Sequence, residues 1–226
     1  MRIIRNSGGQ AGRLQMADWA RSLLLLGSAV GLSLGNCAVV ADEPDAAATA
    51  DAQRVAITVC GTCHGPLGNS RQPKFPRLAG QHASYLAAQL KAFRAQSRGD
   101  PDAIGYMWGM ASELSDTTVD ALASYYSGQK AEASAARDPP LVARGREIYE
   151  HGIASQGVPA CSLCHGPDAH GLQDFPRLAG QHAQYSLKQL ASFQSSMRNV
   201  AIMHGVAQNL HLADMQAVAA YLEAQP

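Results

Sequence analysis

A short pattern, C-x-x-C-H, occurs twice in this chain and limits its fold more than any other feature. It reads C-G-T-C-H at residues 60–64 and C-S-L-C-H at residues 161–165. This pattern is the attachment signature of a c-type haem: the two thiols form thioether bonds with the haem vinyl groups, and the His that follows can ligate the iron. The sequence therefore predicts two covalent haem c groups, held by Cys60, Cys63 and His64 and by Cys161, Cys164 and His165.

Two other kinds of site use C-x-x-C pairs. A structural zinc site uses two such pairs separated by roughly 15–20 residues, and far more residues separate the two pairs here. A thioredoxin-like dithiol needs a βαβ context and no His after the second Cys. Both alternatives explain less of the pattern than two haem groups do.

The chain is an internal duplication. The sequence F-P-R-L-A-G-Q-H-A at residues 75–83 returns unchanged at residues 175–183, which is a period of about 100 residues. Such a period indicates two small domains rather than a solenoid. Tyr85, Gln89 and Arg98 also have counterparts one period later, and helix packing is sufficient to explain the first two.

Each half shows the same three helical patterns and no convincing strand. Leu86, Leu90 and Phe93 lie at the i, i+4 and i+7 spacing of an amphipathic helix. We expect an all-α fold of two tandem domains, each wrapped around one haem, with an opening helix that runs into the haem motif. The expected helices cover roughly residues 47–59, 83–96 and 116–127 in the first half, and 141–151, 183–195 and 213–224 in the second.

The N-terminus is typical of a targeting segment. Four Arg precede the apolar run at residues 23–34, a combination that indicates a signal peptide and is short for a membrane-spanning helix. We predict cleavage before Asp42 and export to the periplasm. Two alternatives remain: lipidation at Cys37, which follows a lipoprotein-like L-G-N, and an uncleaved anchor. The expected division is signal peptide 1–41, first domain 42–130, linker 131–140 and second domain 141–226.

Charge excludes some partners. The 226 residues carry 18 basic and 18 acidic side chains, a formal net charge of zero. The chain therefore has no large basic field for nucleic acid and no polybasic tail for anionic lipid.

The sixth iron ligand decides whether a haem is open for catalysis or limited to electron transfer. Aligning M-W-G-M-A-S-E-L (107–114) with M-H-G-V-A-Q-N-L (203–210) pairs Met107 with Met203 and sets Met110 opposite a Val. We predict that Met107 and Met203, each in a loop, are the sixth ligands. His82 and His182 also repeat and are the competing pair, although capping or surface roles suit them.

Residues near the motifs can support the ligands. A ligating His needs a partner for its other ring nitrogen, and the carbonyls of Pro76 and Pro176 are candidates because Pro accepts but does not donate. Arg77 and Arg177 could pair with haem propionates.

Together, the two C-x-x-C-H motifs, the two F-P-R-L-A-G-Q loops and the two downstream Met positions resemble the diheme cytochrome c4 family. This resemblance implies two class I cytochrome c domains related by a pseudo-twofold axis, with axial pairs His64–Met107 and His165–Met203. It implies Pro76 and Pro176 as the carbonyl partners. Members of the family are periplasmic electron carriers, often membrane-associated, that feed terminal oxidases.

We therefore expect a diheme one-electron carrier rather than an enzyme, working between a respiratory donor complex and a terminal oxidase. One alternative is the electron-accepting subunit of a periplasmic dehydrogenase of the flavocytochrome type. A second is a diheme peroxidase-like enzyme, which would need a haem with an open or displaceable sixth position. The matched Met residues argue against the second alternative.

Overall fold

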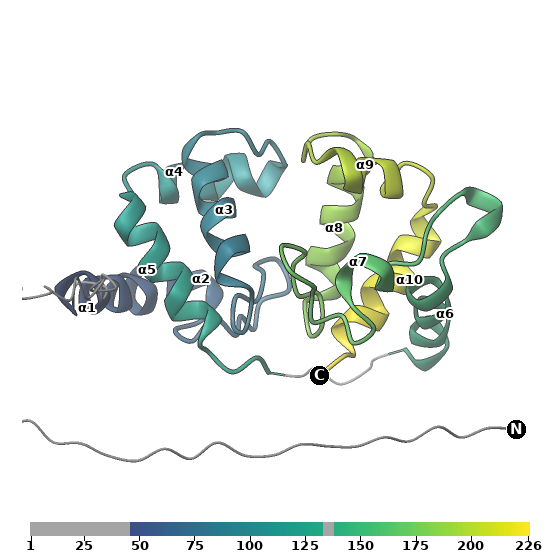
Figure 1. The fold of residues 1–226 in the computed structure, drawn as a ribbon, viewed down its shortest axis with the longest axis horizontal. Helices are drawn as coiled ribbons and strands as arrows, with labels where there is room; N and C mark the ends of the chain where they lie inside the picture. The colour runs from purple at the N-terminus through teal and green to yellow at the C-terminus, as the bar shows by residue number, and fades with distance from the viewer. Residues whose placement is uncertain (1–45, 133–137) are drawn as a thin grey trace, which may run out of the picture. The chain divides into compact units, whose positions relative to one another are not determined.

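A computed structural model describes residues 46–132 and 138–226, all of which belong to one compact unit. Those residues form helices and loops, with a single isolated bridge between Ile153 and Val158 and no strand, which confirms the all-α prediction (Figure 1). The first half contains α1 (Ala46–Val55), η1 (Ala56–Cys60), α2 (Gly61–His64), α3 (Ala83–Arg94), η2 (Ala103–Met107), α4 (Trp108–Ala111) and α5 (Asp116–Ser127). The second half contains α6 (Pro139–His151), η3 (Ala154–Gln156), α7 (Ser162–His165), α8 (Ala183–Gln194), α9 (Ala201–Ala207) and α10 (Leu212–Glu223).

Each half has its own apolar core around its closing helix. In the first half α5 packs against α1 and α3, and Leu86, Leu122 and Tyr126 are buried between them. In the second half α10 packs against α6 and α8 around a larger cluster. The closing helix therefore supplies one face of each core, and Ser115 caps α5 by accepting a hydrogen bond from the Thr118 N–H.

The opening helix differs between the halves. In the first half α1 continues through the π-helical turn η1 to Cys60, as the sequence predicts. In the second half α6 ends at His151, as the predicted range does, but a loop separates it from the haem motif, so the expectation that this helix runs into the motif is wrong. Gly152 ends the helix with a φ of +71°, and a Cβ there would lie 2.3 Å from the Val158 carbonyl oxygen. Only Gly can make this close, left-handed turn.

The two Met segments are helical, whereas the sequence predicts loops. Met107 is the last residue of η2, and Met203 lies within α9. Both π-helical turns of the described residues adjoin predicted haem ligands, because η1 ends at Cys60 and η2 at Met107. Such turns are rare and often mark functional sites.

The predicted signal peptide, including Cys37, lies outside the described residues. Within residues 46–132 and 138–226, no helix combines the length and the apolar character needed to cross a bilayer.

Candidate haem-binding sites

In each half the motif residues occupy one short helical turn. The helices α2 and α7 end at His64 and His165, and each imidazole is only 7% exposed. The four motif Cys are partly buried in the same turns. A helical turn places both sulfurs of a C-x-x-C pair and the following His on neighbouring positions, as attachment to one porphyrin requires.

The second ring nitrogen of each His has the predicted neighbour. The Nδ1 atom of His64 lies 2.9 Å from the Pro76 carbonyl oxygen, and that of His165 lies 3.0 Å from the Pro176 carbonyl oxygen. Since a carbonyl only accepts, Nδ1 carries the proton and donates it in both halves. Nε2 is then the nitrogen with the free lone pair, which is the form that binds a metal.

Burial favours the uncharged form of the motif residues. It lowers the pKa of His64 and His165, an effect that the hydrogen bonds to the two Pro carbonyls partly offset. It also raises the pKa of the Cys161 thiol to about 11. The site therefore favours a neutral imidazole, which is the form of an iron-ligating His.

Aromatic packing connects the first motif with the Met107 segment. The Phe75 ring meets His64 edge-on at 6.1 Å between centroids and meets Tyr106 at 5.7 Å. Met107 follows directly and packs beside Phe93. In the second half His165 and Phe175 form the same edge contact at 5.9 Å, while Met203 is half-buried after Ile202. The fold thus brings the first His and the residue before Met107 into contact with the same Phe.

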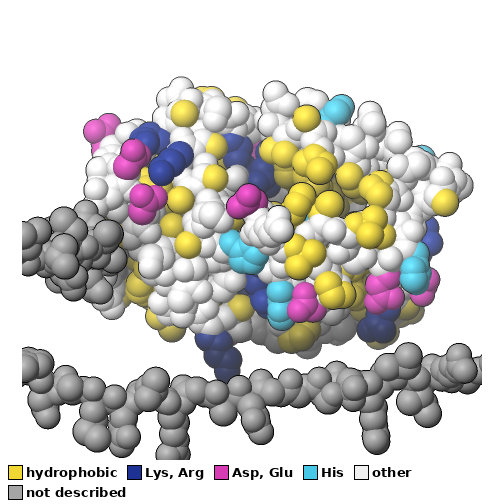
Figure 2. Space-filling model, viewed as in Figure 1, with side chains coloured by type: hydrophobic (Ala, Val, Ile, Leu, Met, Phe, Trp, Pro, Cys, Tyr) yellow, Lys and Arg dark blue, Asp and Glu magenta, His cyan; other side chains and the backbone are white. Residues whose placement is uncertain are grey.

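Large apolar side chains are exposed along the segments that carry the motifs and the two Met. Figure 2 shows such side chains gathered over α7, α8 and α9. An exposed apolar surface of this kind marks a binding face, and beside two Cys and a neutral His it fits a covalently attached porphyrin. The exposed residues include Ile57, Val59, Ile104, Tyr106 and Met110 in the first half and Leu163, Val200 and Ile202 in the second.

The competing pair, His82 and His182, is used in contacts between the halves. The Nδ1 atom of His82 lies 3.1 Å from the Gln173 carbonyl oxygen. His182 is 3% exposed, and its two ring nitrogens face the Ser70 carbonyl at 2.8 Å and Glu223 at 3.4 Å. The expectation of a capping or surface role is therefore wrong for His182, which gives no side-chain cap. Its side chain is buried because the other half supplies an acceptor.

The two Arg that follow the Pro residues are held by backbone carbonyls. Arg77 donates to the carbonyls of Glu132 and Gly180, each at 2.9 Å, and Arg177 donates to the Pro226 carbonyl at 2.6 Å. The bond to Gly180 places the Arg77 guanidinium at the boundary between the halves, whereas Pro226 belongs to the same half as Arg177.

Sequence reasoning missed a polar interface between the halves. Gln81 and Gln181 reach across it in a reciprocal pair: Gln81 bonds the backbone N–H and carbonyl of Arg177, and Gln181 bonds those of Arg77. Arg98 likewise donates to Gln189 of the other half at 2.8 Å. The available signal was the repetition of these polar residues in both halves, which helix packing alone does not require.

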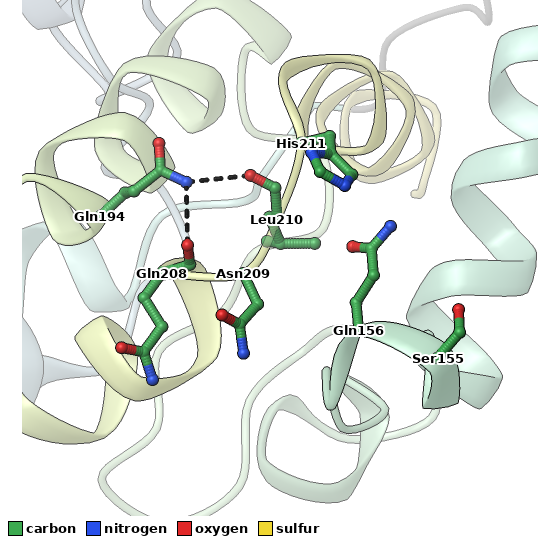
Figure 3. A pocket seen from close by; sticks show the side chains of 7 residues that line it. All are labelled: Ser155, Gln156, Gln194, Gln208, Asn209, Leu210 and His211. Atoms are coloured by element: carbon green, nitrogen blue, oxygen red, sulfur yellow. Dashed lines mark hydrogen bonds between the residues drawn. The ribbon is translucent and has the colours of Figure 1, made fainter.

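A surface hollow of about 410 Å³ lies elsewhere in the second half, beside the start of α10. Figure 3 shows that polar side chains line most of it, and that the Gln194 amide donates to the carbonyls of Gln208 and Leu210. None of the lining residues belongs to a haem motif. They are Ser155, Gln156, Gln194, Gln208, Asn209, Leu210 and His211.

Comparison with known proteins agrees with the geometry. The family model described as cytochrome c matches residues 49–128 and again residues 142–225. Cytochrome c4 of Stutzerimonas stutzeri is 41% identical over 189 residues, 79% of this chain and 90% of the relative. A thiosulfate dehydrogenase electron acceptor of Thiomonas intermedia is 39% identical over 174 residues, 74% of this chain and 78% of the relative.

A solved structure gives the same answer. The crystal structure of reduced recombinant cytochrome c4 from Pseudomonas stutzeri superposes with a TM-score of 0.70 at 37% identity, and the match covers 79% of this chain and 98% of that one. The predictions of tandem cytochrome c domains and of two haem c groups are confirmed. The chain therefore belongs to the cytochrome c4 family, and it is a diheme c-type cytochrome that carries electrons.

Proposed function

We propose that the motif thiols hold the two haems by thioether bonds and that the axial pairs are His64–Met107 and His165–Met203. The observation that carries this proposal is the matched contact between each motif His and a Pro carbonyl, at 2.9 Å and 3.0 Å. It fixes the same tautomer and the same ring direction in both halves. The thioether bonds are assigned to Cys60, Cys63, Cys161 and Cys164.

Each bound haem supplies an iron that alternates between ferrous and ferric states, so the protein accepts and releases single electrons. The chain's own residues tune that exchange. Pro76 and Pro176 hold the imidazoles and increase their basicity. A Met thioether as sixth ligand gives a higher reduction potential than a second nitrogen ligand would. That potential suits a carrier that works late in a respiratory chain.

We place this carrier in the periplasm, where it passes electrons from a respiratory donor complex to a terminal oxidase. In this proposal it also associates peripherally with the membrane. Residues 1–41 are the export signal in this proposal, followed by domains 42–130 and 141–226 and the linker 131–140. The similarity to cytochrome c4 over 90% of that relative supports it. N-terminal sequencing of the exported protein tests the signal: the protein should begin at Asp42. A lipidated N-terminus at Cys37, or an intact Met1, would instead mean that the protein is anchored to the membrane.

A second candidate is the acceptor of a periplasmic dehydrogenase. It is supported by the 39% identity to a protein named thiosulfate dehydrogenase electron acceptor. The two candidates differ in the donor. Stopped-flow kinetics distinguish them. If the protein is a respiratory carrier, a quinol-oxidising donor complex should reduce the ferric protein rapidly. If it is a dehydrogenase acceptor, a thiosulfate-oxidising dehydrogenase should reduce it rapidly.

Carbon monoxide tests the ligand assignment. The absorption spectrum of the reduced protein should not change when carbon monoxide is added, because both sixth positions hold protein ligands. Met107→Ala and Met203→Ala should each let one haem bind carbon monoxide, while the control Met110→Ala should not. If the unaltered protein bound carbon monoxide, at least one of the two Met assignments would be wrong. If the Met107 or the Met203 variant bound none, the Met replaced in that variant would not be a ligand.

A further inference from the structure

The segment that carries Met107 is anchored on both sides to one pair of residues. On one side, the Asp100 carboxylate accepts a hydrogen bond from the Ala103 N–H at 3.1 Å, where η2 begins. On the other side, the indole N–H of Trp108 donates to the Arg98 carbonyl at 2.8 Å. Met107 lies between these two anchors. Its position therefore depends on where Arg98 and Asp100 are held.

The second half of the molecule holds that pair. The guanidinium of Arg98 bonds Asp100 at 2.6 Å, and their side chains are 7% and 2% exposed. The same guanidinium donates across the interface to the Gln189 amide oxygen at 2.8 Å and to the Tyr185 hydroxyl at 3.3 Å. Because the ion pair is buried, solvent and salt screen it little. The position of Asp100 therefore depends on the contacts that Arg98 makes with the second half.

Two further contacts reach the same segment. The Gly99 N–H donates to the Met197 carbonyl of the other half at 3.1 Å. Lys188 of α8 pairs with Asp102, the residue that immediately precedes η2. The second half thus binds this segment at three successive points before it reaches Met107.

The second half has no equivalent arrangement for Met203. Eight residues separate Arg98 from Met107, but only four separate Arg198 from Met203, and none of those four is acidic. Val200 precedes α9 and gives it no side-chain cap. At the position of Trp108 stands His204, whose Nδ1 lies 2.9 Å from the Phe193 carbonyl of its own half. Arg198 does reach across to Tyr85 and Gln89, and its carbonyl accepts from the Val200 N–H at 3.1 Å. Among the described residues, however, no acidic side chain and no indole ties Arg198 to α9 as Asp100 and Trp108 tie Arg98 to the Met107 segment.

We propose that the second half positions Met107 through Asp100, Arg98 and Lys188, so that the interface holds the sixth ligand of the first haem but not that of the second. This inference rests on the proposed assignment of Met107 and Met203 as ligands. Asp100 and Lys188 are positioning residues in it. Whatever loosens the interface then weakens the sixth ligand of the first haem and not that of the second.

The test uses the full-length diheme protein and three variants. Asp100→Asn removes the charge that bonds Arg98, and Lys188→Met removes the contact to Asp102 at a half-exposed site, where folding is not at risk. Asp120→Asn is the matched control, since Asp120 pairs with Lys91 at 3.4 Å on the exposed surface of the first half. The readouts are the proton NMR signals of the two iron-bound Met methyl groups and the fraction of ferrous haem that binds carbon monoxide.

Asp100→Asn should weaken or abolish one methyl signal and make up to half of the haem reactive to carbon monoxide, while the other signal stays in place. Lys188→Met should act on the same signal to a smaller extent, and Asp120→Asn should change neither. Unchanged signals in both Asp100→Asn and Lys188→Met, or equal loss of both signals, would overturn the inference.

Met107→Ala separates this outcome from a failure of the proposed function. If Met107→Ala removes the same signal that Asp100→Asn weakens, both the ligand and its positioning are supported. If Met107→Ala removes a signal that Asp100→Asn leaves intact, only the positioning fails. If Met107→Ala removes no signal, the ligand assignment itself is wrong.

Discussion

Replacing Gln81 by Ala should measurably uncouple the two halves. The Gln81 side chain is 7% exposed and makes three hydrogen bonds. Its Oε1 accepts from the Arg177 N–H at 2.9 Å and from the His82 N–H at 3.0 Å, and its Nε2 donates to the Arg177 carbonyl at 2.8 Å. Two of the three bonds cross to the other half, so the substitution leaves an N–H and a carbonyl unpaired there.

The expected cost follows from that count. A buried hydrogen bond contributes about 0.5–1.5 kcal/mol net, and leaving a buried partner unsatisfied costs about 1–3 kcal/mol. For Gln81→Ala we expect a loss of about 2–4 kcal/mol in the free energy of unfolding, because the half-buried Arg177 backbone can regain some bonding to water. The control Gln184→Ala removes an exposed amide from α8 and should stay within about 0.5 kcal/mol of the parent.

Guanidinium chloride unfolding of the holoprotein, followed by far-ultraviolet circular dichroism, measures both variants. The double variant Gln81→Ala/Gln181→Ala should cost less than the two single losses added together, since the two amides belong to one reciprocal pair and residues in contact couple. A Gln81→Ala protein as stable as Gln184→Ala would show that the interface adds nothing to folding. The reciprocal bonds of Gln81 and Gln181 with the other half would then not stabilise the fold.

Two further changes test the packing and the electrostatics. Gly145→Ala puts a Cβ 2.0 Å from the Ala217 carbonyl oxygen, so thermal unfolding should show a loss of about 1–3 kcal/mol from overpacking. The control Gly128→Ala, whose added Cβ would meet its nearest atom at an ordinary 3.6 Å, should stay within about 0.5 kcal/mol of the parent. The hydrogen bond from Arg94 lowers the pKa of Asp116 below 3.8, so Asp116 stabilises the fold above that pH and loses its effect as the pH falls through the lower folded-state pKa. Urea midpoints of Asp116→Asn and the parent should therefore differ at neutral pH and converge in acid; a constant difference would contradict the assignment.

The sequence predicted the features that local chemistry controls. Both haem motifs, the middle and closing helices and the Pro carbonyls opposite His64 and His165 follow from residue types at fixed short spacings. The break between α6 and the second motif did not, because it depends on Gly152 meeting the Val158 carbonyl, a contact within the loop that periodicity does not reveal. The helical Met segments were missed for a related reason: Gly residues flanking Met107 and Met203 favoured loops, and tertiary packing overrides that preference.

The interface was missed for a different reason. Tyr85, Gln89 and Arg98 repeat in both halves, and a helix pattern alone assigned the first two to packing within one domain. In two related domains a repeated residue can have another role. If the domains are related by a pseudo-twofold axis, a residue of one domain and its copy in the other can both lie at the interface and bond across it. Buried polar groups must be bonded, so repeated polar residues without partners in their own half are the natural candidates for such an interface. Gln89 and Gln189 lie at this interface, where each accepts from the Arg side chain of its own half and from that of the other half.

The unchanged loop of residues 75–83 and 175–183 follows from two simultaneous demands. Pro76 presents its carbonyl to His64, and the next residue, Arg77, presents its N–H and carbonyl to Gln181 of the other half. In each half, one stretch therefore orients the imidazole proposed as an iron ligand and also joins the domains. Any shift of one half against the other reaches both imidazoles through this loop. Through Asp100 it also reaches Met107, so the first haem is coupled to the interface on two sides and the second on one.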